Sequence, residues 1–140
     1  MQKNITNRKV GIIFGAWDLL HAGHVLTLKE CKSNCDHLTV GLQVNPYLER
    51  KEKNKPIQSL VERQIQLMGC RYVDDIVIYE TEKDLEDILK SFKFDVRFLG
   101  EDYKGGKLHI TGKDICPIVY VSRRHSYSST ELRERMKKYG

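Results

Sequence analysis

The sequence predicts an α/β protein with one open, mainly parallel five-stranded sheet and helices on both faces. Short apolar runs typical of strands alternate with stretches of helical periodicity, the arrangement that builds a helix-covered parallel sheet. The length of 140 residues fits one domain spanning residues 1–140. Hydrophobic residues make up 40% and charged residues 31% of the chain, as in globular proteins. In such sheets ligands bind at the carboxyl ends of the strands.

The first half of the chain supplies two strands and two helices. Residues 10–14 form an apolar run that enters Gly15, and a helix is expected over residues 22–33. Residues 38–44 indicate a second strand, which Asn45-Pro46 ends. Ser59 and Glu62 form a capping-box pattern for a helix that runs to about Met68.

The second half continues the alternation. Residues 75–79 indicate a third strand, and a helix beginning near Thr81 has an apolar face at Leu85, Ile88, Leu89 and Phe92. Residues 96–99 and 118–121 are expected to be strands, separated by an irregular loop over residues 101–114 that is rich in glycine. Ser128, followed by Glu131, indicates a charged terminal helix to about Lys138.

The charge indicates anionic partners. The net charge is +5 and the pI about 9.0, which suits nucleic acid, acidic lipid or phosphorylated metabolites. Basic residues gather in one loop and after the last strand: Arg50, Lys51, Lys53, Lys55, Arg123 and Arg124. The absence of an apolar stretch of about 20 residues predicts no membrane partner and a cytoplasmic location.

The segment Gly15-Ala16-Trp17-Asp18-Leu19-Leu20-His21-Ala22-Gly23-His24 follows the first predicted strand directly. Gly15 permits a sharp turn, and His21 and His24 share one face as the helix begins. Unpaired backbone N–H groups at a helix start attract phosphate, and imidazoles can add donors. Gly23 leaves room for the ligand. The segment therefore predicts a polyphosphate site.

This segment resembles the GxFDxxHxGH signature of the cytidylyltransferase family, with Trp17 in place of phenylalanine and Ala16 in place of threonine or valine. Further similar segments follow in the family's order: Glu62-Arg63, Arg71-Tyr72-Val73-Asp74, Gly100-Glu101-Asp102-Tyr103 and residues 123–130. The resemblance extends from about Val10 to Met136 and implies a Rossmann-like nucleotidyltransferase fold and a homodimer.

The resemblance also implies a set of site residues. Catalytic roles are expected for His21, His24, Lys53 and Arg123. Contacts to the nucleotide or acceptor are expected from Gly15, Ala16, Trp17, Asp18, Gly23, Lys51, Lys55, Arg63, Arg71, Asp102, Ser128, Ser129 and Thr130. Lys51 and Lys53 match the family's phosphate-binding lysines, with Lys55 as the alternative if the loop is one residue longer. Mg²⁺ is expected to be bound mainly through nucleotide phosphates, with no metal ligand from the protein.

Residues 123–130 depart most from the family's RTEGISTT motif. Ser126 replaces glycine and Tyr127 replaces isoleucine, whereas Arg123, Ser128 and Thr130 are kept. Phosphate contacts are therefore expected here, and the contacts to the base and the acceptor stay open.

Several residues also have structural interpretations. Asp18 is either an acid at a helix start or a residue that orients ligand or backbone. Trp17 is expected to pack beneath the nucleotide, and Tyr127 either fills the core or forms a wall of the base pocket. His37 and His109 are interpreted as surface or core residues.

The resemblance implies transfer of CMP from CTP to a small phosphorylated acceptor such as glycerol 3-phosphate, with release of pyrophosphate. No general base is required, because the second pKa of a phosphate is about 6. The alternative enzyme is an ATP-dependent adenylyltransferase acting on a sugar phosphate such as heptose 1-phosphate. A nucleotide or RNA binding module is a third possibility, disfavoured because aromatic residues do not interleave with the basic loop.

Overall fold

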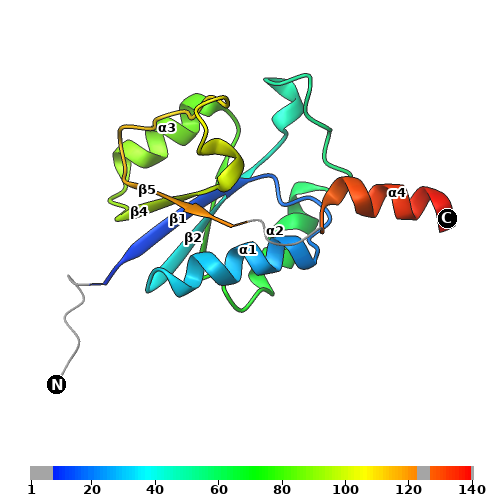
Figure 1. Cartoon of the computed structure of the whole chain (residues 1–140), viewed down its shortest axis with the longest axis horizontal. Helices are drawn as coiled ribbons and strands as arrows, with labels where there is room; N and C mark the ends of the chain where they lie inside the picture. Colours follow the sequence, from blue (N-terminus) through cyan, green and yellow to red (C-terminus); the bar gives the residue numbers. More distant parts are fainter. Residues whose placement is uncertain (1–7, 123–126, 140) are drawn as a thin grey trace.

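The structure is a computed structural model that describes residues 8–122 and 127–139 (Figure 1). Within these residues strands and helices alternate as expected. The helices and strands are β1 (Val10–Gly15), α1 (Ala22–Ser33), β2 (His37–Gln43), the 3₁₀ helix η2 (Pro46–Leu48), α2 (Leu60–Met68), β3 (Asp75–Tyr79), α3 (Glu82–Ser91), β4 (Val96–Gly100), the 3₁₀ helix η3 (Glu101–Tyr103), β5 (Ile118–Val121) and α4 (Ser129–Tyr139).

The five strands form one parallel sheet in the order β3-β2-β1-β4-β5. The chain builds outward from β1 through β2 to β3, and then returns to the other side of β1 with β4 and β5. Ile12 of β1 is paired with Thr39 of β2 on one side and with Arg97 of β4 on the other. The strand order therefore reverses between β1 and β4, which is where ligands bind in open α/β sheets.

Each face of the sheet buries its own apolar cluster. Ile13 and Phe98 belong to a cluster with Leu28 of α1 and Leu67 of α2. The neighbouring residue Ile12 belongs to a second cluster with side chains of α3. Successive side chains of a strand point to opposite faces, so one strand contributes to both clusters. Figure 1 shows α1 and α2 on one side of the sheet and α3 on the other, which confirms the predicted fold class.

Two differences from the sequence-based expectation concern β2 and α3. The second strand runs from His37 to Gln43, one residue earlier at each end than predicted. The prediction that Phe92 completes the apolar face of α3 is wrong, because the helix ends at Ser91. Phe92 has extended backbone angles (φ −112°, ψ 145°), and 58% of its surface is exposed. Phe92 is the C-cap residue, whose backbone N–H still donates to the carbonyl of Ile88, so the sequence pattern carried the helical period one residue beyond the helix.

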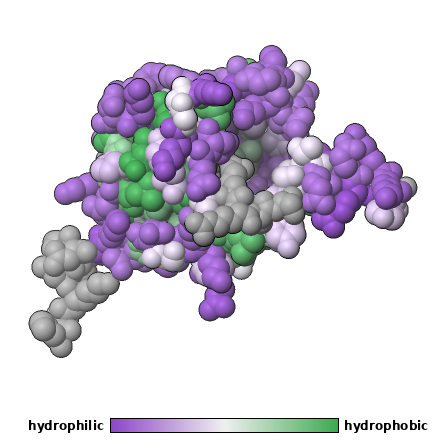
Figure 2. Space-filling model, in the orientation of Figure 1, coloured by the Kyte–Doolittle hydropathy of each residue, from purple (hydrophilic) through white to green (hydrophobic). Residues whose placement is uncertain are grey.

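The terminal helix α4 projects from the body of the molecule (Figure 1). None of its described residues is buried, and Figure 2 shows its surface as mainly hydrophilic. Among the described residues of this helix, Ser129 at its start is the one that borders the cleft described below. Among the described residues, no helix has the length and apolar character needed to cross a membrane.

Candidate active site

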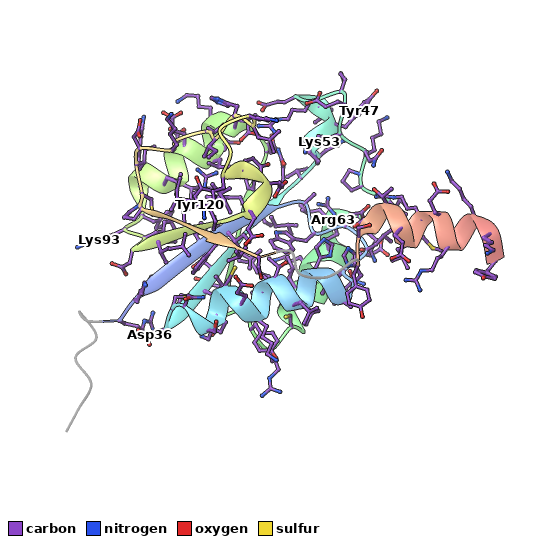
Figure 3. All side chains as sticks on the ribbon, in the orientation of Figure 1. Asp36, Tyr47, Lys53, Arg63, Lys93 and Tyr120 are labelled. Atoms are coloured by element: carbon purple, nitrogen blue, oxygen red, sulfur yellow. The ribbon has the colours of Figure 1, made fainter. Side chains whose placement is uncertain are left out.

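A cleft of about 370 Å³ opens at the carboxyl end of the sheet. Its walls come from the end of β1, the start of α1, the loop after β2, the end of β4, residues 109–111 and the start of α4. Figure 3 shows Lys53 and Tyr47 at this end of the molecule, opposite Asp36 and Lys93. The cleft lies where the strand order predicts a ligand site.

The two motif histidines cap the first helix together. Nδ1 of His21 accepts a hydrogen bond from the backbone N–H of Gly23 (3.0 Å), and Nδ1 of His24 accepts one from the backbone N–H of His21 (3.3 Å). This is the reciprocal pattern of a capping box, built from imidazoles. Their rings stack with centroids 3.9 Å apart. Because each Nδ1 is an acceptor, each neutral ring carries its proton on Nε2, the atom that can donate to an anion.

The turn before this helix holds two non-glycine residues in the left-handed region. Trp17 has φ 55° and Leu19 has φ 53°. The indole N–H of Trp17 donates to the carbonyl of Gly41 (3.1 Å), and the backbone N–H of Leu19 donates to Oε1 of Gln58 (2.7 Å). A side chain at Gly15 would place Cβ 3.1 Å from the Trp17 ring. The turn is therefore held by these hydrogen bonds and by packing on the buried tryptophan, which borders the cleft.

Asp18 joins this turn to two other parts of the chain. Its buried carboxylate accepts hydrogen bonds from the backbone N–H groups of Ile57 (2.8 Å) and Gln58 (3.0 Å). It also pairs with Arg133 of α4, with Nη2 and Oδ2 2.8 Å apart. Asp18 therefore orients backbone, and it lies outside the lining of the cleft.

Arg63 has a similar position behind the site. Only 2% of the residue is exposed. Its guanidinium donates to the carbonyls of Ala16 (2.9 Å), Gln43 (2.6 Å) and Val44 (2.6 Å). Burial lowers the pKa of Arg63, and the nearby charge of Asp18 acts in the opposite direction. The structure thus places Arg63 beneath the motif turn and outside the lining of the cleft.

The basic loop contributes one lysine to the lining of the cleft. Lys53 borders it, whereas the ammonium groups of Lys51 and Lys55 lie 4.4 and 5.0 Å from the ring centroid of Tyr47. Figure 3 shows Lys53 in this loop and Tyr47 in the preceding 3₁₀ helix η2. The structure therefore favours Lys53 over its two neighbours for a contact to a ligand in the cleft.

The start of α4 meets the start of α1 in the cleft. Oγ of Ser128 accepts a hydrogen bond from the backbone N–H of Glu131 (3.1 Å). Oγ of Ser129 lies 3.1 Å from Nε2 of His21. Two helix N-termini and an imidazole thus converge on one region, an arrangement suited to a polyphosphate.

Other predicted site residues lie outside this convergence. Arg71 is exposed, and its guanidinium carbon lies 5.8 Å from the ring centroid of Tyr72. Asp102 and Thr130 are also exposed and do not border the cleft in this structure. Arg123 lies outside the described residues. The ligand contacts expected of these four residues stay predictions.

The cleft also contains residues that sequence reasoning did not assign to a site. They are Arg97, Tyr103, His109 and Thr111. Arg97 is a charged residue with only 4% of its surface exposed. A charged residue inside the apolar run of β4 was the available signal for Arg97. His109, interpreted as a surface or core residue, is exposed and borders the cleft. Burial lowers the pKa of Arg97, and the nearby Tyr79 and Glu82 oppose that shift.

Comparison with known proteins agrees with this geometry. The glycerol-3-phosphate cytidylyltransferase of Staphylococcus aureus is 30% identical over 89% of this chain and 92% of its own length, and that of Bacillus subtilis is 33% identical over 88% and 93%. The crystal structure of a lipopolysaccharide core biosynthesis protein from Thermoplasma volcanium has the same fold, with a TM-score of 0.61, 22% identity and coverage of 96% of this chain and 90% of that one. Residues 12–135 match the model of the cytidylyltransferase-like family. The chain belongs to this family of nucleotidyltransferases.

Proposed function

We propose that the protein transfers CMP from CTP to a small phosphorylated acceptor, with glycerol 3-phosphate as the first acceptor to test, and releases pyrophosphate. The observation that carries this proposal is the stacked pair His21 and His24 at the start of α1, facing the start of α4 across one cleft. The two bacterial relatives that match this chain over nearly their whole length bear the name of this activity.

The reaction requires positioning and charge stabilisation more than proton transfer. An oxygen of the acceptor phosphate attacks the α-phosphorus of CTP, and the bond from that phosphorus to the bridging oxygen breaks. The bond electrons leave with pyrophosphate. Because the acceptor phosphate is largely ionised at neutral pH, the protein has to align the two substrates and stabilise the developing charge. The Nε2–H donors of His21 and His24, the ammonium of Lys53 and the helix N-termini suit that task.

Mg²⁺ fits this site only through the substrates. Among the described residues, no group of three or more His, Cys, Asp or Glu side chains could hold a metal ion. Glu82 borders the cleft, and its carboxylate forms an ion pair with Arg50. We therefore propose that Mg²⁺ enters with the triphosphate, whose oxygens supply its ligands.

Adenylyl transfer from ATP is the second candidate. The bifunctional protein HldE of Caulobacter vibrioides is 33% identical over 91% of this chain, which covers 27% of that longer protein. The motif here also has the HAGH form expected for the ATP-dependent relatives. The start of α1 and the start of α4, where the triphosphate is expected to bind, suit CTP and ATP equally.

We also propose that the protein is a homodimer. Val61, Ile65 and Met68 recur along the outer side of α2, and each is 62–68% exposed. Such an apolar stripe on a helix surface is typical of an interface. A molecular mass near twice the 16.3 kDa of one chain, measured by light scattering, would support the dimer. A cytoplasmic location stays a prediction of the sequence.

The decisive assay is pyrophosphate release by the purified protein with CTP or ATP as the sole nucleotide. Each nucleotide is offered with glycerol 3-phosphate or with heptose 1-phosphate, and the product is identified by mass. Release with CTP and a CDP-linked product support the proposal. Release with ATP alone would identify an adenylyltransferase. Binding of single-stranded RNA with steep salt dependence, without release from either nucleotide, would indicate a binding module.

A further inference from the structure

Arg97 lies on the opposite side of the sheet from the histidines. Its neighbours in β4, Val96 and Phe98, belong to the apolar cluster that packs under α1. Because side chains alternate along a strand, Arg97 lies on the α3 side, where its guanidinium carbon is 5.2 Å from the ring centroid of Phe14. Both Arg97 and Phe14 border the cleft. The cleft therefore extends around the end of β1, from the histidines to Arg97.

The guanidinium of Arg97 is incompletely paired. Within the described residues, Nη1 of Arg97 donates a hydrogen bond to the backbone carbonyl of Thr111, and the buried Nε has no partner. No carboxylate of those residues lies within ion-pair distance of Arg97, and the nearby Glu82 is paired with Arg50. A buried charge without a counter-charge costs several kcal/mol, so this position is poorly explained by stability alone.

The surroundings suit a small anion. Nη1 is engaged by Thr111, which leaves the edge formed by Nε and Nη2, and that edge can donate two parallel hydrogen bonds to a carboxylate or phosphate. Phe14, Tyr79 and Leu85 border the same part of the cleft with apolar surface. Low local polarity strengthens an ionic hydrogen bond made there. A neutral hydroxyl would leave the charge of Arg97 uncompensated.

The location of Arg97 separates it from the proposed triphosphate site. His21, His24 and the helix starts lie on the α1 side of β1, whereas Arg97 lies on the α3 side. A small acceptor whose phosphate reaches the histidines can extend its other end toward Arg97. Building on the proposed function, we propose that Arg97 determines acceptor specificity by binding an acidic group, a carboxylate or a second phosphate, at the end of the acceptor remote from the attacking phosphate.

The test compares acceptors that differ only at that end. Glycerol 3-phosphate carries a hydroxymethyl group there, 3-phosphoglycerate a carboxylate and glycerol 1,3-bisphosphate a phosphate. We expect the better of the two acidic acceptors to exceed glycerol 3-phosphate about 100-fold in kcat/KM, the effect of a buried charge pair. The acceptor that wins identifies the acidic group.

Variants assign this preference to Arg97. Arg97→Met should lower kcat/KM for the acidic acceptor about 100-fold and for glycerol 3-phosphate less than about fivefold. Arg97→Lys, which keeps the charge and loses the fork, should lower it about tenfold. Arg8→Met, at an exposed arginine that precedes β1 at the amino end of the sheet and lies outside the cleft, is the matched control and should change neither value. Urea unfolding of each variant separates loss of folding from loss of binding.

Two outcomes would overturn this inference. One is equal kcat/KM of the wild-type protein for all three acceptors, and the other is an equal loss for all three in the Arg97 variants. Absence of pyrophosphate release with any acceptor would instead contradict the proposed function. In that case calorimetry with 3-phosphoglycerate still tests Arg97, because unchanged binding by Arg97→Met, or no binding by the wild type, refutes its role.

Discussion

Arg63→Met removes a buried cation that links the motif turn to the end of β2. Its guanidinium donates to the carbonyl of Ala16 in the turn and to the carbonyls of Gln43 and Val44 where β2 ends. Its Nε adds a longer hydrogen bond of 3.3 Å to the carbonyl of Gln58. Methionine fits a similar volume and supplies no donor, so these carbonyls would lose their partner in the interior.

The size of the effect follows from those contacts. A hydrogen bond to a charged group contributes about 1.5–3 kcal/mol, and part of the loss is recovered by apolar burial of methionine. Because the bonds form one network and do not add, we expect Arg63→Met to lower the free energy of unfolding by about 3–5 kcal/mol. That is a large part of the about 5–15 kcal/mol typical of a domain, and it corresponds to a fall in Tm of roughly 10–15 °C.

Urea unfolding followed by circular dichroism measures this change. Arg71→Met is the control, because Arg71 is exposed and should alter stability by less than about 0.5 kcal/mol. A loss of less than about 1 kcal/mol in Arg63→Met, combined with weaker CTP binding, would refute the structural role. Arg63 would then be the nucleotide contact that the family resemblance implies.

Three other predictions test separate parts of the site. Asp18→Asn should lower the free energy of unfolding by about 1–3 kcal/mol in urea titrations, because a buried carboxylate with three partners is lost. Unchanged stability would contradict the structural role of Asp18. Lys53→Ala should raise the KM for a phosphate substrate about tenfold at low salt, and Lys51→Ala less than twofold, because Lys53 borders the cleft and Lys51 does not. A larger effect of Lys51→Ala would assign the phosphate contact to Lys51. Arg123→Lys should lower kcat/KM at least about tenfold and Arg124→Lys only slightly, because Arg123 matches the arginine of the family motif and its guanidinium can donate two parallel hydrogen bonds to a phosphate. Equal small losses in both variants would show that these arginines supply only positive charge.

The fold could be predicted because its signals are local. Apolar runs, the capping box at Ser59, the helical period that begins near Thr81 and the break at Pro46 each act within a few residues of the chain. The histidine pair could be located for the same reason, since its spacing puts both rings on one turn. Its form as an imidazole capping box was not predicted, because the usual rule requires Ser or Thr with Glu or Gln.

The remainder of the site depends on contacts between distant segments. Arg97 reaches Phe14 only because β1 and β4 pair with Ile12 opposite Arg97. Similarly, Asp18 and Arg133 are 115 positions apart in the chain and meet because α4 begins beside α1. Nothing in the local sequence specifies such a register, so the roles of these residues become visible only in the folded chain.

The turnover of His24→Ala with CTP tests the central claim most directly. Both imidazoles lie at the start of α1, where Nε2–H groups can stabilise charge on the departing pyrophosphate. In the folded variant, kcat for pyrophosphate release should fall about 100-fold or more, whereas the loss of its capping bond should lower stability by only about 0.5–2 kcal/mol. A folded His24→Ala protein that releases pyrophosphate at close to the wild-type rate would contradict the assignment of this cleft as the catalytic site.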